Sequence, residues 1–200
     1  MKNLLIIFLF IVSISACSQK DNIKYEQALS YIEEYYSNCD KQLLEKALEI
    51  LDSTSINNNQ IVNTKISLYF LLKKYKEGIA FMNALPVDRF YRPYQKEMYI
   101  KSMLALNEGD PLKRHFYYEQ AILSINSYLS NNPKDDQALA DLFYTKLRFE
   151  SRDKVLQYLD EYLKTNKNKE FLELLRQSIS KDISTIDCSS FVPSDLQSED

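Results

Sequence analysis

Glycine is almost absent from this chain of 200 residues, which contains only Gly78 and Gly109. Glycine supplies the positive φ angles and close backbone approaches that hairpin turns, phosphate-binding loops and dinucleotide-binding folds require. A chain with two glycines is therefore poorly suited to hairpin-rich sheets and to those nucleotide sites. We expect an all-α protein.

Apolar residues recur with helical spacing along most of the chain. Leu44, Ala47, Leu48 and Leu51 trace one stripe, because residues three and four apart share a helix face. Asp110-Pro111 combines an N-cap residue with a proline suited to the first helical position. Helices are predicted near residues 24–37, 40–53, 58–74, 76–85, 93–107, 111–131, 135–149, 152–165 and 168–182.

Two of these helices share a pattern at a fixed offset. The segment AILSINSYLSNN at 121–132 aligns with VLQYLDEYLKTN at 155–166, an offset of 34 residues, so that their apolar and aromatic positions coincide. A period of this size is typical of stacked helical hairpins, each too small to bury its own apolar face.

The second helix of this pattern resembles that of a tetratricopeptide repeat. Ala121, Ile125, Tyr128 and Pro133 have the spacing found in that family. The segments YKEGIAFMNALP at 75–86 and EKALEILDST at 45–54 are weaker copies, with a small residue at Gly78 and at Ala47 respectively.

The resemblance implies an α-solenoid, a right-handed array of stacked antiparallel helical hairpins with about eight or nine helices over residues 24–183. The copies depart from the family pattern. The first-helix tryptophan is absent, Lys167 stands where the proline belongs, and the spacings between copies are 31, 43 and 34 residues. The resemblance informs the architecture and not the ligand.

The N-terminus has the order of a secretory signal. A basic start at Lys2 precedes an unbroken apolar run at 4–12 and small residues up to Ala16. That run is too short to span a bilayer, because nine helical residues reach only about 14 Å. We expect residues 1–16 to be a cleaved signal peptide.

Ile14-Ser15-Ala16-Cys17 resembles a bacterial lipobox, in which the cysteine is lipidated and becomes the mature N-terminus. The following charged segment, SQKD, is similar to the short signal after the cysteine in surface-exposed lipoproteins of Bacteroidetes. The resemblance implies acyl chains on Cys17, a tether at 17–23, and anchoring in the cell envelope, at the outer membrane and with surface display as one option. An ordinary signal peptide with an incidental cysteine is the alternative.

Two cysteines remain if Cys17 is lipidated. An envelope location would permit a disulfide between Cys39 and Cys188, but two unpaired thiols are equally compatible with the sequence. The last residues, DCSSFVPSDLQSED at 187–200, are acidic and proline-broken, and we expect a flexible tail over 184–200.

Charge and chemistry exclude several classes of function. Without Lys2 the chain carries 24 basic against 28 acidic residues, a charge of −4 that does not favour nucleic-acid binding. The only histidine is His115, and no cysteines cluster, so neither a zinc site nor a catalytic set is indicated. We predict no catalytic residues, no metal, no cofactor and no enzymatic activity.

The tetratricopeptide resemblance implies one candidate binding surface, because the first helix of each hairpin in that family lines a groove. The corresponding residues here are Gln60, Asn63 and Ser67 in one hairpin, and Gln137, Tyr144 and Arg148 in another. The same spacing is compatible with plain solvent exposure.

A second candidate surface is the aromatic and basic loop formed by Arg89, Phe90, Tyr91 and Arg92. Aromatic side chains give a large contact area at low entropic cost. The chain contains 15 tyrosines, which can equally fill the seams between helices.

The sequence thus predicts a membrane-anchored lipoprotein with a tetratricopeptide-like domain that binds a protein or peptide partner. Two alternatives stay open. One is an acidic lipoprotein immunity factor that binds a toxin. The other is an accessory glycan-binding lipoprotein, in which a sugar would stack on Tyr91 or Tyr94.

Overall fold

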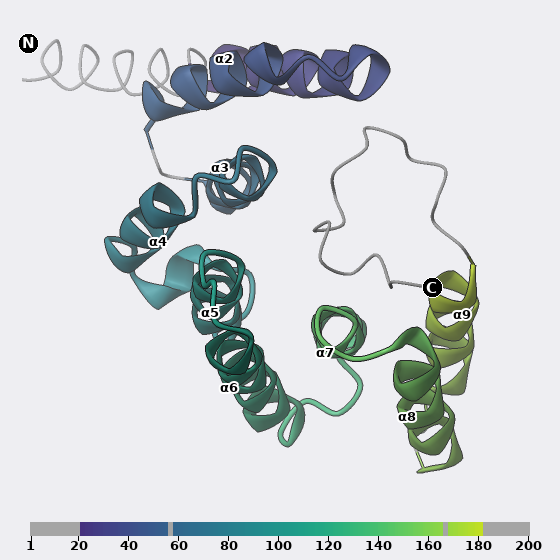
Figure 1. Cartoon of the computed structure of the whole chain (residues 1–200). Coiled ribbons are helices and arrows are strands. Elements are labelled where there is room, and N and C mark those ends of the chain that lie inside the picture. The colour runs from purple at the N-terminus through teal and green to yellow at the C-terminus, as the bar shows by residue number, and fades with distance from the viewer. Residues whose placement is uncertain (1–20, 56–57, 166–167, 182–200) are drawn as a thin grey trace, which may run out of the picture. The chain divides into compact units, whose positions relative to one another are not determined.

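The protein is all-α in a computed structural model that describes residues 21–55, 58–165 and 168–181 (Figure 1). These residues form nine α-helices and one 3-10 helix, with no strand among them. The predicted signal peptide (1–16), Cys17 and the predicted acidic tail (184–200) lie outside the described residues. The chain divides into two compact units, Met1–Lys74 and Tyr75–Asp200.

All nine predicted helices are present. The first is already helical at Asp21, the first described residue, and among the other described helix ends none differs from its prediction by more than three residues. The first unit contains a helix over 21–38, α2 (Lys41–Asp52) and α3 (Asn59–Leu71). The second contains α4 (Tyr75–Asn83), the 3-10 helix η1 (Val87–Arg89), α5 (Gln95–Leu106), α6 (Pro111–Leu129), α7 (Asp136–Lys146), α8 (Arg152–Thr165) and α9 (Lys169–Ser180).

The first helix is longer than the sequence predicted, because residues 21–23, assigned to the tether, are helical. Two contacts hold this end of the helix on the loop after α2. The Lys24 ammonium donates hydrogen bonds of 2.8 Å to both the carbonyl and the hydroxyl oxygen of Ser53. The Asp21 carboxylate accepts a hydrogen bond from the Ser55 hydroxyl. These contacts join residues 29 and 34 positions apart in the chain.

Left-handed backbone conformations occur in this unit without glycine. Cys39 has φ of 61° and Lys73 has φ of 57°. Lys73 follows α3 in a Schellman motif, in which the Lys74 N–H donates to the Tyr69 carbonyl at 2.9 Å and the Lys73 N–H donates to the Phe70 carbonyl at 3.1 Å. Helix termination here therefore uses a lysine in a conformation that favours glycine.

Cys39 is disulfide-bonded. The two other cysteines of the chain, Cys17 and Cys188, both lie outside the described residues. Pairing of Cys39 with Cys188 therefore stays a prediction.

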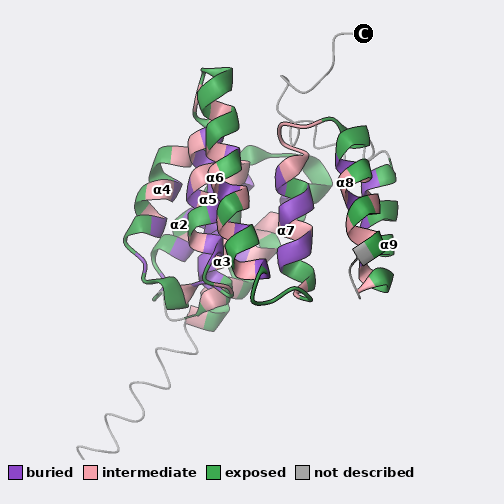
Figure 2. Ribbon diagram, turned by 90° about the horizontal axis from the view of Figure 1, so that it is seen from below, coloured by how far each residue is buried: buried purple, intermediate pink, exposed green. Residues whose placement is uncertain are grey.

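The second unit is built from successive helices that pack on one another. α6 packs extensively along α5 and also contacts α7, while α8 and α9 form a pair (Figure 1). Ala121, Ile125, Leu139 and Leu159 are fully buried in one cluster that joins α6, α7 and α8 (Figure 2). This cluster sets the spacing of the three helices that form the candidate site.

Helix starts in this unit follow the predicted chemistry. The Asp110 carboxylate accepts a 2.9 Å hydrogen bond from the Leu112 N–H, with Pro111 at the first helical position of α6. Asp135 caps α7 by accepting a 3.1 Å hydrogen bond from the Ala138 N–H. Side-chain caps of this kind satisfy amides that the helix leaves without acceptors.

Candidate functional site

An open groove of about 400 Å³ lies among α6, α7 and α8. Its volume is in the range of ligand-binding clefts, about 300 to 1,000 Å³. Most of the lining is aliphatic or aromatic, with a few polar groups. The lining residues are Leu142, Phe143 and Lys146 of α7, Tyr158, Glu161 and Tyr162 of α8, and Asn126 of α6.

The apolar part of the groove is preorganised. Phe143 and Leu142 are only 1% and 3% exposed, so their positions are set by the core beneath them. The Phe143 ring meets the Tyr162 ring edge-on, with centroids 5.7 Å apart and planes at 89°. A side chain that enters this groove would contact aromatic groups that are already ordered, which lowers the entropic cost of binding.

Charged groups of both signs border the groove. The Lys146 ammonium lies 4.2 Å from the centroid of the Tyr158 ring and 3.7 Å from a carboxylate oxygen of Glu150. The Lys154 ammonium lies 5.8 Å from the same Tyr158 ring. On α8, Glu161 is exposed. The groove therefore offers a cation on the α7 side and a carboxylate on the α8 side, around an apolar floor.

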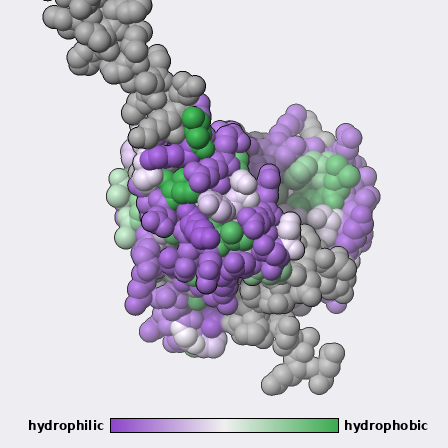
Figure 3. Space-filling view, turned by 90° about the horizontal axis from the view of Figure 1, so that it is seen from above, coloured by the Kyte–Doolittle hydropathy of each residue, from purple (hydrophilic) through white to green (hydrophobic). Residues whose placement is uncertain are grey.

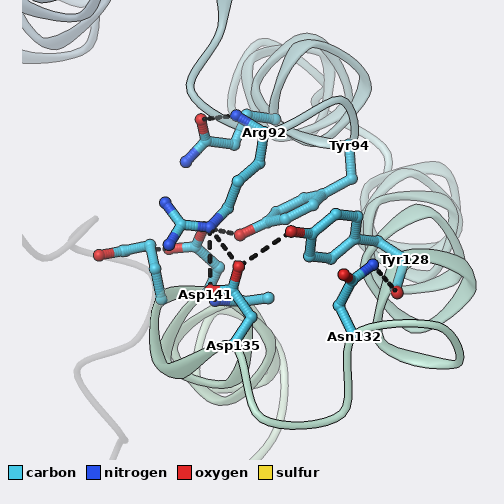
Figure 4. Close-up of polar contacts among 9 residues, drawn as sticks. Arg92, Tyr94, Tyr128, Asn132, Asp135 and Asp141 are labelled. Carbon is cyan, nitrogen blue, oxygen red and sulfur yellow. Dashed lines mark hydrogen bonds and ion pairs between the residues drawn. The ribbon is translucent and has the colours of Figure 1, made fainter.

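A part-buried polar network joins α7, one wall of the groove, to the loop before α5 and to α6 (Figure 4). Asp135 is its centre: the Arg92 Nε donates to its two carboxylate oxygens at 2.9 and 2.7 Å, and the Tyr128 hydroxyl donates at 2.9 Å. The Asp135 and Arg92 side chains are 15% and 29% exposed. Burial alone would raise the pKa of Asp135, but the hydrogen bonds from Arg92, the Ala138 N–H and Tyr128 outweigh it and lower that pKa.

A second carboxylate, Asp141, lies six residues further along the chain, on α7. It accepts hydrogen bonds from the Tyr94 hydroxyl at 2.6 Å and the Gln137 amide at 2.8 Å. Burial dominates here and raises the pKa of Asp141 despite those bonds. Burial also raises the pKa of Tyr94, with a further contribution from its bond to Asp141, and raises the pKa of Tyr99 to about 12. Both tyrosines stay protonated and act as donors or packing groups.

The residues predicted to line a groove on α3 lie on that helix. Gln60 and Ser67 are exposed, and the Gln60 N–H donates to the Asn58 cap at 2.8 Å. Asn63 is half-buried, and its amide donates to the Asn59 carbonyl of the same helix at 2.8 Å.

Gln137 and Tyr144, the two predicted residues that lie on α7, have intramolecular partners and lie away from the groove. Gln137 is bonded to Asp141, and the Tyr144 hydroxyl lies 3.0 Å from the Ser178 hydroxyl of α9. Arg148 is half-buried beyond the end of α7. At about 100° per residue, Gln137 and Tyr144 point roughly 160° to 180° away from Lys146 around the helix. The groove is therefore on the face of α7 opposite to the predicted one.

The aromatic and basic loop is largely internal. Phe90 is 4% exposed, and Arg92 is paired with the cap of α7. Tyr91 is 55% exposed, whereas Tyr94, the other tyrosine suggested for sugar stacking, is 5% exposed. Arg89, at the end of η1, is half-buried. Tyr91 is thus the aromatic residue of this loop that remains open to a partner.

His115 is an exposed residue of α6. Its ring meets the Phe149 ring edge-on at 4.6 Å, and its Nε2 lies 3.3 Å from the Glu119 carboxylate. In the described part of the chain, no group of three or more His, Cys, Asp or Glu side chains is placed to hold a metal ion. None of the helices described there has the length and apolar content needed to cross a bilayer.

Comparison of the chain with models of protein families, with curated proteins and with solved structures finds no match.

Sequence reasoning missed the groove and the two tyrosines of α8 that form one of its walls. Tyr158 and Tyr162 are four residues apart, so they share one helix face. That spacing was the available signal. It did not distinguish a wall from an ordinary packing seam, because Tyr162 also belongs to the core stripe of the repeat.

Proposed function

We propose that this protein is a membrane-anchored envelope lipoprotein whose helical hairpins bind a segment of another protein in the groove among α6, α7 and α8. The groove carries the proposal, because it combines a preformed aromatic floor with a cation and a carboxylate at its border. Extended or helical protein segments present apolar anchors flanked by charges, which suits such a site.

Burial at equivalent positions supports a tetratricopeptide-like array. The position that holds a small residue in three of the four sequence copies falls on α2, α4, α6 and α8, and it is buried in all four: Ala47, Ala121 and Val155 at 0% exposure, and Gly78 also buried. Each second helix of a hairpin therefore turns this position inward, as stacking of repeats requires. We propose the right-handed solenoid on this basis.

The anchor is the second part of the proposal and rests on Ile14-Ser15-Ala16-Cys17. Several acyl chains on Cys17 would hold the domain firmly at a membrane, since one chain alone binds only reversibly. Replacement of Cys17 by Ser should leave an unprocessed precursor that carries no lipid. Normal cleavage and acylation of C17S would contradict the lipobox as the anchor.

Charge reversal at the groove tests the binding function. Full-length tagged protein is purified from its native membranes, and co-purifying proteins are quantified for wild type, Glu161→Arg and Glu173→Arg. Both glutamates are exposed helical residues, but only Glu161 borders the groove. A partner retained by wild type and E173R should fall about tenfold with E161R, which corresponds to ~1.4 kcal/mol. Equal recovery with all three proteins would contradict the proposal.

A further inference from the structure

Very little chain joins the first helix to the proposed lipidation site. The chain is already helical at Asp21, and only Ser18, Gln19 and Lys20 separate this residue from Cys17. The four residue steps from Cys17 to Asp21 span at most about 14 Å when the backbone is fully extended. The distance between the lipidated cysteine and the folded first unit therefore has an upper limit.

Unwinding of the first turn would lengthen this connection, but contacts within the first unit hold the turn in place. Lys24 and Asp21 are hydrogen-bonded to the loop after α2. The next residue, Tyr25, has its hydroxyl 3.3 Å from the Thr64 hydroxyl of α3, and Ala28 is fully buried. The helix is thus part of the packed unit from its first described turn, and it cannot act as a spacer.

The level of the lipidated cysteine in the bilayer follows from its acylation. In the lipobox family that Ile14-Ser15-Ala16-Cys17 resembles, the amino group of the mature cysteine is itself acylated, which places its backbone where the acyl chains begin. The headgroup layer of one leaflet is about 5 to 8 Å thick. Of the 14 Å connection, at most about 6 to 9 Å therefore remain above the headgroups.

This remaining length is shorter than the diameter of a helix. An α-helix with its side chains is about 10 to 12 Å across. No other element of the protein therefore fits between the start of the first helix and the headgroups. The side chains available to fill this space are exposed ones of the first turn, Asn22 and Ile23, with Ser53 and Ser55 of the adjacent loop.

The rest of the surface gives no competing reason for membrane contact. On the face of the molecule shown in Figure 3, hydrophilic residues predominate and hydrophobic residues form small, separate patches. A surface of this kind does not insert into a bilayer by itself. The position of the anchor therefore decides which part of the first unit meets the lipid.

Charge around the first turn is balanced. Lys20 and Lys24 are matched by Asp21 and Glu26. Attraction to anionic headgroups therefore contributes little, and the contact should form on zwitterionic lipid as well.

We propose that the first turn of the first helix, through Asn22 and Ile23, rests on the lipid headgroups beside the anchor. The proposal relies on the lipidation of Cys17 in the proposed function, and it is independent of the groove. The bilayer is then a binding partner of the first unit, which the short connection holds at the membrane surface.

A fluorescent amino acid at position 23 tests this contact, because Ile23 is 63% exposed and its replacement leaves the core intact. The full-length lipidated chain is reconstituted in vesicles of phosphatidylcholine, part of which carries a nitroxide on its headgroup. Flotation then isolates the vesicles, so that every chain measured is membrane-held. The matched control has a Gly-Ser linker inserted between Lys20 and Asp21; about 20 residues add a root-mean-square length of about 25 Å.

Nitroxide quenching at position 23 should be about threefold stronger with the natural connection than with the inserted linker. Circular dichroism checks that the two chains have the same helix content. Equal quenching in the two chains would overturn the proposal, since the short connection would then not impose the contact. Failure of the chain with the natural connection to float with the vesicles would refute the anchor itself, and this contact with it.

Discussion

Removing the Asp135 carboxylate should destabilise the second unit far more than removing an ordinary helix cap. In Asp135→Ala, α7 loses its cap, which is worth about 1 kcal/mol. It also loses the charge-assisted bonds from Arg92 and Tyr128, worth roughly 2 kcal/mol together once their exposure is taken into account. We expect a loss of about 3 kcal/mol in the free energy of unfolding.

Asp110→Ala is the matched control, because Asp110 caps α6 through the same kind of bond and is exposed. It should cost about 1 kcal/mol. Urea unfolding of the full chain, followed by circular dichroism, measures both. A D135A loss no larger than that of D110A would refute the argument that Asp135 holds α7 on α6 and on the loop before α5.

The sign of the pH dependence gives an independent check. The folded-state pKa of Asp135 is lowered, so its contribution to stability is present above the unfolded-state value of about 3.9 and is lost as pH falls through the folded pKa. The stability difference between wild type and D135A should therefore shrink below about pH 4. A difference that stays constant into acid would contradict the ionised pairing with Arg92.

Three further predictions use other parts of the chain. Wild type should lose stability as pH rises from about 4, because the folded-state pKa of Asp141 is raised and the folded protein favours the protonated carboxyl group. Asp141→Asn should remove this loss, which urea unfolding at several pH values measures. Lys73→Gly should stabilise by about 0.5 to 1 kcal/mol in the same assay, since glycine relieves the left-handed strain, whereas Lys73→Ala should be nearly neutral. Non-reducing peptide mapping should pair Cys39 with Cys188. Cys17 is out of reach, because the helix before Cys39 is about 27 Å long while the four residues from Cys17 to the described start of that helix span at most about 14 Å. A Cys39–Cys17 peptide would contradict this distance argument and the lipidation of Cys17.

Helix positions could be predicted because their signals are local. The Asp110-Pro111 start is encoded within one turn, and the buried state of Ala121 and Val155 follows from a repeated spacing. Neither needs knowledge of which helices meet. The same holds for the stripe on α2, in which Leu44 and Leu51 are fully buried.

The site could not be predicted because it depends on contacts between distant residues. Arg92 and Asp135 are 43 residues apart, and nothing in either local sequence specifies the pair. Because Arg92 pairs with Asp135, most of the loop that the sequence indicated as a contact surface is internal. On α7 the apolar residues Leu142 and Phe143 follow each other directly, so the pattern did not decide which side faces the groove.

The yield of a crosslinked partner from two positions, one in the groove and one on the opposite face of α7, tests the binding function most directly. Benzoylphenylalanine at Glu161 samples the groove, whereas at Gln137 it samples the opposite face of α7, and both sites are exposed. In cells that carry the anchored full-length chain, we expect one protein partner to be captured from position 161, with about tenfold lower yield from position 137. Capture of that partner from position 137 and not from 161 would contradict the groove as the binding site.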